Sequence, residues 1–292
     1  MGVPRARGRP DLGSRVSLTV QVASPRGLAP RPCYDGPVER LHTLDDLRTA
    51  CTDPLVLWAA QDLGSTVEVW AHGSAVAAAV TDLARRHRLA VTGAVADVAV
   101  LVRALLGRLG PEYRPLGGSD TIVGLCDLVP ELAPSRAFGW MTATRVPAAD
   151  PDGARPASPD ERSAINRVLD ESLPDSLARP GGAGVTRWWV STDEAGVAAC
   201  AADAWSSPAV GLLAGVATSV RARGRGLGRA VTAAGLTTLI REHGTAALMV
   251  DGANTAARAL YESLGMTYRP IRAATPATDI ARQASPGAAC CA

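Results

Sequence analysis

The stretch from Arg221 to Arg229, Arg-Ala-Arg-Gly-Arg-Gly-Leu-Gly-Arg, constrains the fold of this chain more than any other. An apolar run from Val210 to Val220 precedes it and a helical pattern follows it, so its glycines lie between a strand and a helix. Backbone N–H groups that no side chain shields can converge there on phosphate oxygens, and the first helical turn adds its positive dipole end. The stretch therefore predicts an anion site.

Two common phosphate loops do not fit this stretch. A P-loop ends in Gly-Lys-Ser/Thr, whereas this loop ends in Gly228-Arg229-Ala230. A dinucleotide-binding loop needs a third glycine at a fixed offset, which is missing, and an acidic residue about twenty positions on, for which Asp251 is a little late. The remaining pattern is Arg-x-x-Gly-x-Gly, formed by Arg223, Gly226 and Gly228.

A second motif follows the loop. After a helix expected to end near His243 and a strand expected from Ala246 to Asp251, the chain reads Asn254-x-x-Ala-x-x-x-Tyr-x-x-x-Gly-Met. The two motifs together resemble the GNAT superfamily of acyl-CoA-dependent N-acetyltransferases, over residues 210–269 of 292. The resemblance implies an α/β (α+β) GNAT fold, in which a mixed, mostly antiparallel sheet is flanked by helices.

The resemblance also implies how a co-substrate is held. That co-substrate is acetyl-CoA, without a metal, and its pantetheine arm inserts like an extra strand where the strand before the loop splays from its neighbour. The backbone of Thr218, Ser219 and Val220 would pair with the arm, and Asn254 would hydrogen-bond to it. The residues implied to hold the pyrophosphate are Arg223, Gly224, Arg225, Gly226, Leu227, Gly228 and Arg229.

Acyl transfer from a thioester to an amine also needs an acid and a base. Tyr261 lies two helical turns after Asn254 on the same helix face, and the resemblance implies that its phenol protonates the departing thiolate. A packing tyrosine is the alternative. The sequence departs from the family at the base, because Met249 stands where a glutamate often lies. The candidate bases are Asp203, Asp251 and Glu171, or a chain of waters.

Two classes of function stay open. One is an N-acetyltransferase that moves an acetyl group from acetyl-CoA to a primary amine of a small molecule or peptide, by direct attack on the thioester. The other is a non-catalytic acyl-CoA-binding sensor or regulatory module, supported only by the missing glutamate. Tyr261 favours the enzyme, since a protein that merely binds CoA does not need a proton donor at the sulfur.

The rest of the chain predicts a tandem arrangement. A hairpin around His72-Gly73-Ser74, a strand-to-helix step at Thr92-Gly93-Ala94 and a closing strand over 138–142 echo the second half without its loop. An unrelated α/β domain is the alternative. The expected divisions are a disordered basic arm (1–38), a degenerate GNAT-like domain that no longer holds CoA (39–147), a linker (148–158), the catalytic domain (159–275) and a flexible tail (276–292).

The second half begins with a helix start, Ser158-Pro159-Asp-Glu161. A helix to about Leu169 and a second helical segment before Pro180 are expected, followed by a hairpin across residues 193–196. Because the helices before that hairpin commonly cover the acceptor end in this family, three acids there are candidates for substrate contact, with solvated side chains as the alternative. They are Asp170, Glu171 and Asp175.

Composition narrows the partners. The net charge of +2 gives no global field for nucleic acid, so nucleic acid is not expected. No apolar run approaches the roughly 18 residues of a membrane span, so no membrane partner is expected. The six cysteines lack metal-site spacing and predict reduced thiols in a cytoplasm. A monomer or a homodimer is expected.

Overall fold

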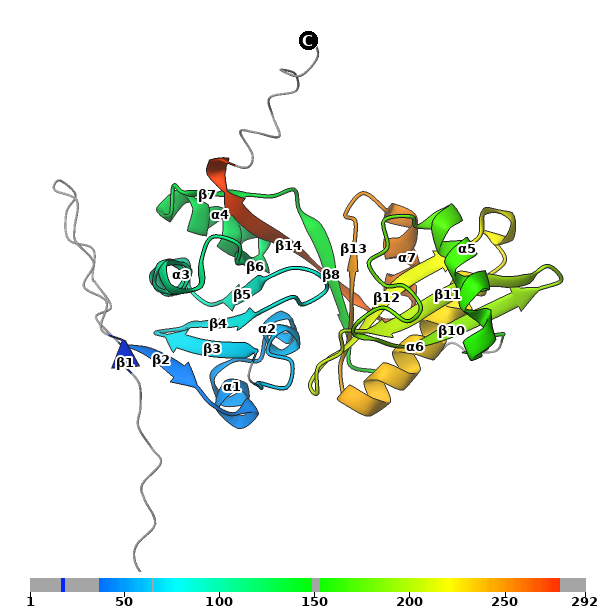
Figure 1. Cartoon of the computed structure of the whole chain (residues 1–292), viewed down its shortest axis with the longest axis horizontal. Helices are drawn as coiled ribbons and strands as arrows, with labels where there is room; N and C mark the ends of the chain where they lie inside the picture. The colour runs from blue at the N-terminus through cyan, green and yellow to red at the C-terminus, as the bar shows by residue number, and fades with distance from the viewer. Residues whose placement is uncertain (1–16, 19–36, 65, 149–152, 279–292) are drawn as a thin grey trace, which may run out of the picture.

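A computed structural model describes residues 17–18, 37–64, 66–148 and 153–278 (Figure 1). The basic arm expected at residues 1–38 and the tail expected at 276–292 lie mostly outside these ranges. Within them the strands form one mixed sheet in the order β1-β2-β3-β4-β5-β6-β14-β8-β13-β12-β11-β10-β9, with β7 paired to β14. Helices flank this sheet, so the expected fold class is confirmed.

The first half contains most of the expected elements. The hairpin β3–β4, the strand β5 and the helix α3 lie where the sequence predicts them, while α2 and β6 were not predicted. The elements are β1 (Ser17–Leu18), β2 (Val38–Leu41), α1 (Leu44–Ala50), α2 (Pro54–Ala59), β3 (Val67–His72), β4 (Ala75–Val80), β5 (Arg88–Thr92), α3 (Val95–Leu109), β6 (Arg114–Gly118), α4 (Ser119–Leu128), β7 (Leu132–Pro134) and β8 (Phe138–Ala143).

The second half follows the expected order with two differences. The prediction of a helical segment before Pro180 is wrong, since residues 173–184 form turns. In addition, Arg155 and Pro156, which were expected in the linker, pair with β10. The elements are β9 (Arg155–Pro156), η1 (Pro159–Glu161), α5 (Arg162–Ser172), β10 (Val185–Asp193), β11 (Gly196–Ala204), β12 (Gly211–Thr218), η2 (Val220–Ala222), α6 (Leu227–His243), β13 (Ala246–Val250), α7 (Thr255–Ser263) and β14 (Thr267–Pro276).

The two halves exchange their last strands. In each half a strand pairs in parallel with a later strand across a helix: β5 with β6, and β12 with β13. The strand β8, expected to close the first half, instead pairs along all of β13, from Gly139↔Val250 to Ala143↔Ala246. Conversely, β14 pairs with β6 of the first half, and β8 and β14 pair with each other at the centre of the sheet (Figure 1).

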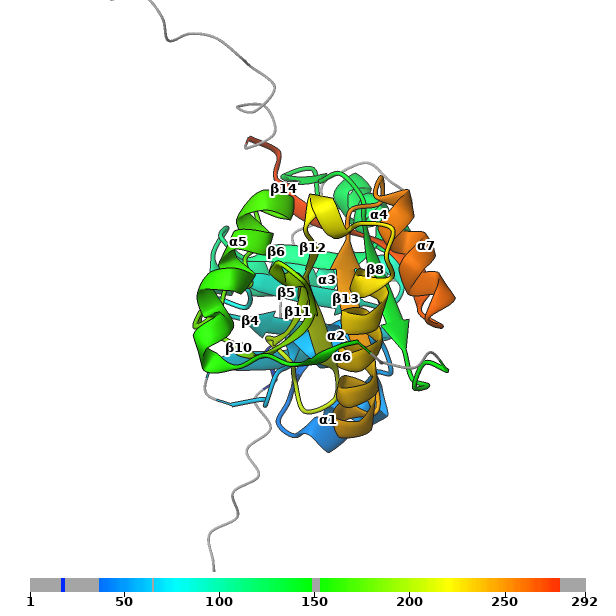
Figure 2. The ribbon, with the colours of Figure 1, turned by 90° about the vertical axis from the view of Figure 1, so that its right-hand side faces the viewer.

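Helices cover both faces of the sheet because side chains alternate along each strand. On β10, Trp188 and Val190 belong to the core under α5, whereas Trp189 packs against α6 on the opposite face. Figure 2 shows α5 on one side of these strands and α6 and α7 on the other. In the first half, α1 and α2 pack on one face and α3 and α4 on the opposite face. Each half therefore has a two-sided core.

The second half starts at a well-fixed helix end. The N–H of Ser158 donates to Glu161 Oε2 at 2.8 Å, and Arg155 donates to both oxygens of the same carboxylate at 2.8 and 2.7 Å. These bonds, the one from Arg155 first, lower the pKa of Glu161 to about 2. The helix start expected at Ser158-Pro159 is therefore confirmed, with the strand β9 tied to it.

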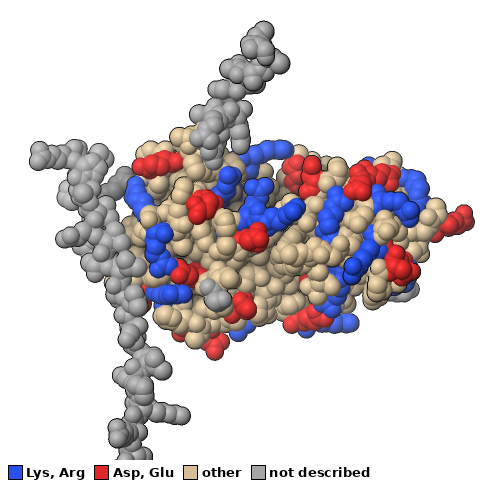
Figure 3. Space-filling model, in the orientation of Figure 1, with Lys and Arg blue, Asp and Glu red and all other residues tan. Residues whose placement is uncertain are grey.

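On the face shown in Figure 3, arginine and acidic side chains are mixed across both halves. None of the helices within the described ranges is long and apolar enough to cross a bilayer. The same ranges hold no cluster of His, Cys, Asp and Glu suited to a metal ion, and in them Cys51, Cys126 and Cys200 are free thiols.

Candidate active site

The glycine-rich loop leads into an uncapped helix. Gly224 and Gly226 have φ of +76° and +80°, a left-handed region that favours glycine, and a Cβ at either would meet nothing within 4 Å. The helix α6 then starts at Leu227, and no described side chain caps it. Its first backbone N–H groups are therefore free donors at the positive end of a 17-residue helix.

A third glycine brings this helix close to the sheet. A Cβ on Gly228 would lie 2.7 Å from Oγ1 of Thr218, the last residue of β12. Only glycine allows such an approach without moving the threonine side chain. The requirement for Gly226 is thus the backbone angle, whereas for Gly228 it is space.

A cleft opens where β12 leaves its parallel neighbour. The strands β12 and β13 pair only at Gly211↔Ala246 and Leu212↔Ala247, and beyond these residues they separate. On its other side β12 carries an irregularity opposite Cys200–Ala202, with Gly215 at φ +58°. The cleft has a volume of about 550 Å³ and is lined by Ser172, Leu173, Val216, Ala217, Thr218, Ala222, Arg223, Gly224, Gly226, Leu227, Gly228, Arg229, Asn254, Ala256, Ala257, Leu260 and Tyr261.

Of the three backbone positions expected to pair with pantetheine, the structure leaves one facing the cleft. The N–H of Ser219 donates to Ala198 O of β11 at 2.8 Å, so that donor is already used. Because amide directions alternate along a strand, the N–H and C=O of Thr218 point to the open edge. The N–H of Val220 donates to Glu171 Oε1 at 3.0 Å. Thr218 therefore keeps the expected role, and Ser219 does not.

The end of α5 also reaches this edge. Ser172 Oγ donates to the carbonyl oxygen of Thr218 at 2.9 Å, and Ser172 and Leu173 both line the cleft. The sequence analysis missed these two residues, and no local signal points to them, since they lie 46 residues from the strand that they contact. Ala257 and Leu260 were also missed, although their spacing from Asn254 places them on the face of α7 that carries Tyr261.

Asn254 and Tyr261 both face the cleft from α7. Asn254 is the N-cap of this helix, and its Oδ1 accepts from the N–H of Ala257 at 3.0 Å, so its amide NH₂ is the part left for a ligand. Tyr261 is 7% exposed, and burial raises the pKa of its phenol to about 12. The phenol therefore stays protonated at neutral pH and can act as a hydrogen donor.

The arginines of the loop divide into two groups. Arg223 lines the cleft. Arg225 instead donates to Asp193 Oδ2 at 3.2 Å, as does Arg221, and Arg225 is not among the residues that line the cleft. Arg229 lines the cleft but also donates to Ser263 at the end of α7. The expectation that all these arginines serve the phosphate directly is thus too simple.

Comparisons with known proteins concern the fold and the family of this chain. Residues 192–273 match the family model of the FR47-like protein. A GCN5-related N-acetyltransferase from Kribbella flavida matches with a TM-score of 0.52 and 19% identity, covering 80% of this chain and 99% of that one. A GCN5-related N-acetyltransferase from Sphaerobacter thermophilus matches with a TM-score of 0.48 and 17% identity, covering 75% and 83%. No curated protein gives a significant match.

This chain has the GNAT acetyltransferase fold. The match to the Kribbella flavida protein covers more of the chain than either half contains, so it extends over both halves. The fold that the motifs of residues 210–269 imply is thereby confirmed. At that identity the likeness concerns the fold alone, and activity has to be argued from the site.

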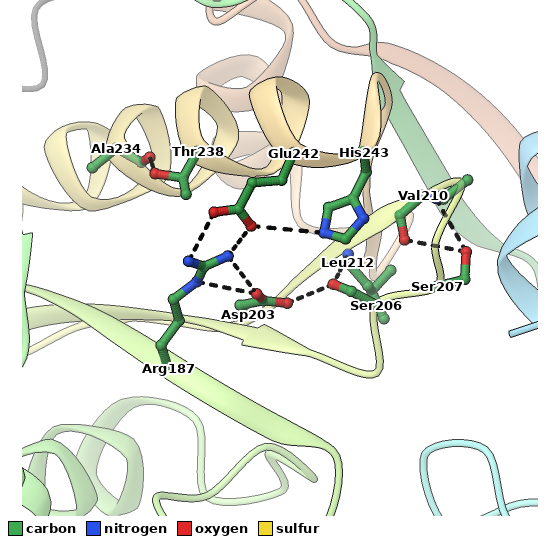
Figure 4. Close-up of polar contacts among 10 residues, drawn as sticks. All are labelled: Arg187, Asp203, Ser206, Ser207, Val210, Leu212, Ala234, Thr238, Glu242 and His243. Carbon is green, nitrogen blue, oxygen red and sulfur yellow. Dashed lines mark hydrogen bonds and ion pairs between the residues drawn. The ribbon is translucent and has the colours of Figure 1, made fainter. Parts of the chain in front are cut away.

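The GNAT fold of this chain places Asp203 away from the cleft. Asp203 is 3% exposed, and its Oδ2 accepts from Arg187 Nε at 3.2 Å and Nη2 at 3.0 Å, while Ser206 donates to the other oxygen (Figure 4). Arg187 in turn donates to Glu242, on the last turn of α6. Because the loop lies at the first turn of α6, roughly 20 Å away at 1.5 Å per residue, we do not retain Asp203 as a base.

The two other candidate bases, Asp251 and Glu171, already accept hydrogen bonds from other groups of the chain. Asp251 follows β13, and its Oδ1 accepts from the N–H of Ala253 at 3.0 Å and from Arg136 at 3.3 Å. Glu171 holds the N–H of Val220, at the phosphate end of β12. No Asp, Glu or His stands among the described residues that line the cleft. The base therefore stays a prediction, with Asp251 and water as the candidates.

Proposed function

We propose that this chain is an acetyl-CoA-dependent N-acetyltransferase, which moves an acetyl group to a primary amine of a small molecule or peptide by direct attack on the thioester. The observation that carries the proposal is the cleft of about 550 Å³ in which the uncapped end of α6, the open edge of β12 and the Tyr261 phenol meet. A phosphate-binding end and a proton donor in one cleft suit a CoA thioester.

The residues present fit such a co-substrate. The free N–H groups of Leu227, Gly228 and Arg229 would hold the pyrophosphate, with Arg223 as a cation beside them. The N–H of Thr218 would bond to the pantetheine arm along the edge of β12, and the amide NH₂ of Asn254 would donate to it from the opposite wall. The bound thioester would supply the activated acetyl group.

The chemistry left to the chain is proton transfer. The Tyr261 phenol, kept protonated by burial, would donate to the sulfur as negative charge collects there. Removal of the proton from the amine would fall to water or to Asp251. A water path suits an amine with a low pKa, such as the α-amine of a peptide at about 8, better than a lysine amine at about 10.4. The acceptor is therefore proposed to be a weakly basic amine.

The first half is proposed to bind no CoA, and the chain is proposed to work in the cytoplasm as a monomer or homodimer. Free thiols such as Cys51, Cys126 and Cys200 are typical of a reducing compartment. A CoA-binding sensor is the outcome if binding occurs without turnover. Tyr261 argues against that outcome, because a sensor does not need a buried phenol at the sulfur end of the cleft.

Two glycine variants test the binding site. Gly226 and Gly244 flank α6, have φ of +80° and +77°, and would each give a new side chain nothing within 4 Å. Replacing either with glutamate therefore costs a similar backbone strain, about 1–2 kcal/mol. Only Gly226→Glu places a carboxylate among the phosphate-binding N–H groups.

The measurement is calorimetric titration with acetyl-CoA. Wild type and Gly244→Glu should bind one acetyl-CoA per chain with the same affinity, whereas Gly226→Glu should lose binding by more than about 100-fold. Equal affinity of the two variants would refute the site. Thiol release from acetyl-CoA in the presence of pooled amines then decides between the enzyme and the sensor, since a sensor would bind but release no thiol.

A further inference from the structure

The carboxylate of Asp193 lies under the phosphate loop. Asp193 is the last residue of β10, and its side chain is 5% exposed. Its Oδ2 accepts from Arg221 and, at 3.2 Å, from Arg225, while its Oδ1 accepts from the N–H of Ala195 at 3.0 Å. The hydrogen bond from Arg221 is the main cause that lowers the pKa of this carboxyl, so it is ionised at neutral pH.

We propose that Asp193 is a positioning residue that holds the glycine-rich loop in its phosphate-binding shape before acetyl-CoA arrives. The inference rests on the proposed function of the cleft. It assigns Arg221 and Arg225 to the shape of the loop, and leaves Arg223, which lies between them, to face the ligand.

The glycine part of the loop needs such an anchor because its own side chains do not fix it. The first turn is fixed by Ala222, which is fully buried and whose N–H donates to Ser219 O at 2.9 Å, whereas Gly224 and Gly226 carry no side chain. Glycine residues have more conformational freedom to lose than any others, so a loop rich in them is disordered unless other contacts hold it. At the start of the loop, the N–H of Val220 donates to the carboxylate of Glu171. Beyond the loop, the guanidinium of Arg229 donates to Ser263. Asp193 holds the part between these points.

The inference predicts a change in acetyl-CoA affinity opposite to the change that simple electrostatics predicts. A carboxylate beside a phosphate site repels the negatively charged ligand. The same carboxylate also binds two arginines that would otherwise attract the ligand. On charge alone, Asp193→Asn should therefore tighten the binding of acetyl-CoA. If Asp193 positions the loop, the same variant should weaken the binding instead.

Glu194 provides a matched control. It is the next residue in the same turn, it is exposed, and Glu194→Gln removes the same charge at nearly the same place. We expect Asp193→Asn to raise the Kd for CoA and the KM for acetyl-CoA about two- to fivefold, because an ion pair of this kind is worth up to roughly a factor of five. The kcat should stay within about twofold, and Glu194→Gln should change none of these values.

A second variant covers the case in which Asp193→Asn does not fold. Asp193→Glu keeps the charge but moves the carboxylate by one methylene, so positioning predicts a smaller but measurable loss of CoA affinity, whereas charge alone predicts none. Unchanged or tighter binding in either variant overturns the inference.

Amide hydrogen exchange in the protein without CoA separates this inference from the proposed function. The amides of residues 221–226 should exchange faster in Asp193→Asn than in wild type or Glu194→Gln. If the exchange rates are unchanged, Asp193 does not position the loop. If wild type binds no CoA, the proposed function fails, while the exchange experiment still decides whether Asp193 orders the loop.

Discussion

Two strand-to-helix junctions, β5–α3 in the first half and β12–α6 in the second, occupy matching places in the topology but carry opposite chemistry. At the first, between β5 and α3, the third helical residue is Asp97, which is 8% exposed and accepts from both the N–H and the Oγ of Ser74 at 2.8 Å. At the second, between β12 and α6, the third helical residue is Arg229, on the wall of the cleft. The first helix end thus carries its own anion, and the second leaves room for one.

The two parallel strand pairs, β5–β6 and β12–β13, also differ in how far they stay together. In the first half, β6 stays against β5 beyond their last register pair, since a Cβ on Gly117 would lie 2.8 Å from the carbonyl oxygen of Val91. In the second half, β12 and β13 separate after two register pairs. The edge of β12 is therefore open beyond Leu212, whereas the end of β6 is still in contact with β5.

The helices that follow β6 and β13 complete the contrast. The N-cap of α7 is Asn254 and its seventh residue is Tyr261, whereas the N-cap of α4 is Gly118 and its seventh residue is Leu125, a fully buried core side chain. A pocket of about 430 Å³ does remain in the first half, but its Arg269 is bonded by Asp53 at 2.7 and 2.8 Å. A shared topology thus becomes a site only where donors and space are left unfilled.

The largest effect is expected from separating the halves. A chain of residues 153–278 lacks β8, so β13 would lose all five of its register pairs with that strand, from Ala246↔Ala143 to Val250↔Gly139, and would keep only its two pairs with β12. The strand β14 would lose its pairing with β8 and β6. We expect this chain not to fold, as judged by near-ultraviolet circular dichroism and proteolysis, while residues 37–278 should fold. A folded, CoA-binding second half would show that the first half is dispensable.

The next largest effect concerns Tyr261, which we propose as the proton donor and whose counterpart on α4 of the first half is Leu125. Tyr261→Phe keeps the ring and most of its packing, and removal of a general acid is worth on the order of 10²–10⁴ in rate. We expect kcat to fall by that factor, with CoA affinity changed less than about tenfold. Tyr268→Phe is the control, since Tyr268 packs against Arg258 outside the residues that line the cleft, and its kcat should not change. Equal losses of rate and affinity would mark Tyr261 as a binding residue.

A smaller effect is expected at the first junction. Asp97→Ala leaves the N–H and hydroxyl of Ser74 without their acceptor and should lower the free energy of unfolding by about 1–3 kcal/mol. Acetyl-CoA affinity should not change, because the first half is proposed to bind none. Chemical denaturation and calorimetric titration of the same variant measure both values. A loss of CoA affinity would place a functional site in the first half.

The pH dependence of that stability gives a further check. Hydrogen bonds from Ser74 lower the pKa of Asp97 below its ordinary value of 3.8. Its stabilisation is therefore complete above pH 3.8 and is lost as pH falls through the lower, folded value. The stability difference between wild type and Asp97→Ala should accordingly shrink below pH 3.8 and stay constant from pH 5 to 8.

The smallest effect is expected from the titration of Tyr261, which should change neither the stability nor the kcat at neutral pH. Burial raises its pKa from 10.0 to about 12, so the protonated phenol stabilises the fold fully below pH 10, and this stabilisation is lost as pH rises from 10 to 12. The pH profile of kcat should show no loss of the acid below pH 10. An activity decline with a pKa near 8 would identify a different group as the acid.

Much of the second half could be predicted from the sequence because its signals are local. Gly226 needs a backbone angle that other residues avoid, and Asn254 caps the helix that begins at the next residue. The spacing of Asn254 and Tyr261 brings both to one face of α7 at any tertiary arrangement. Each of these features depends on residues within two helical turns, so the loop, its helix and the position of Tyr261 beside Asn254 followed from the order of residues alone.

Other features depended on the tertiary structure. The strand over 138–142 was predicted, but its partner, β13, lies more than 100 residues away, and an apolar strand pattern does not specify which edge it joins. The same holds for Asp203, which a sequence leaves free as a base and the fold buries against Arg187. Ser172 reaches Thr218 only because α5 folds over β12. Local backbone preferences determined the elements, and long-range packing and pairing decided which polar groups stayed free to act.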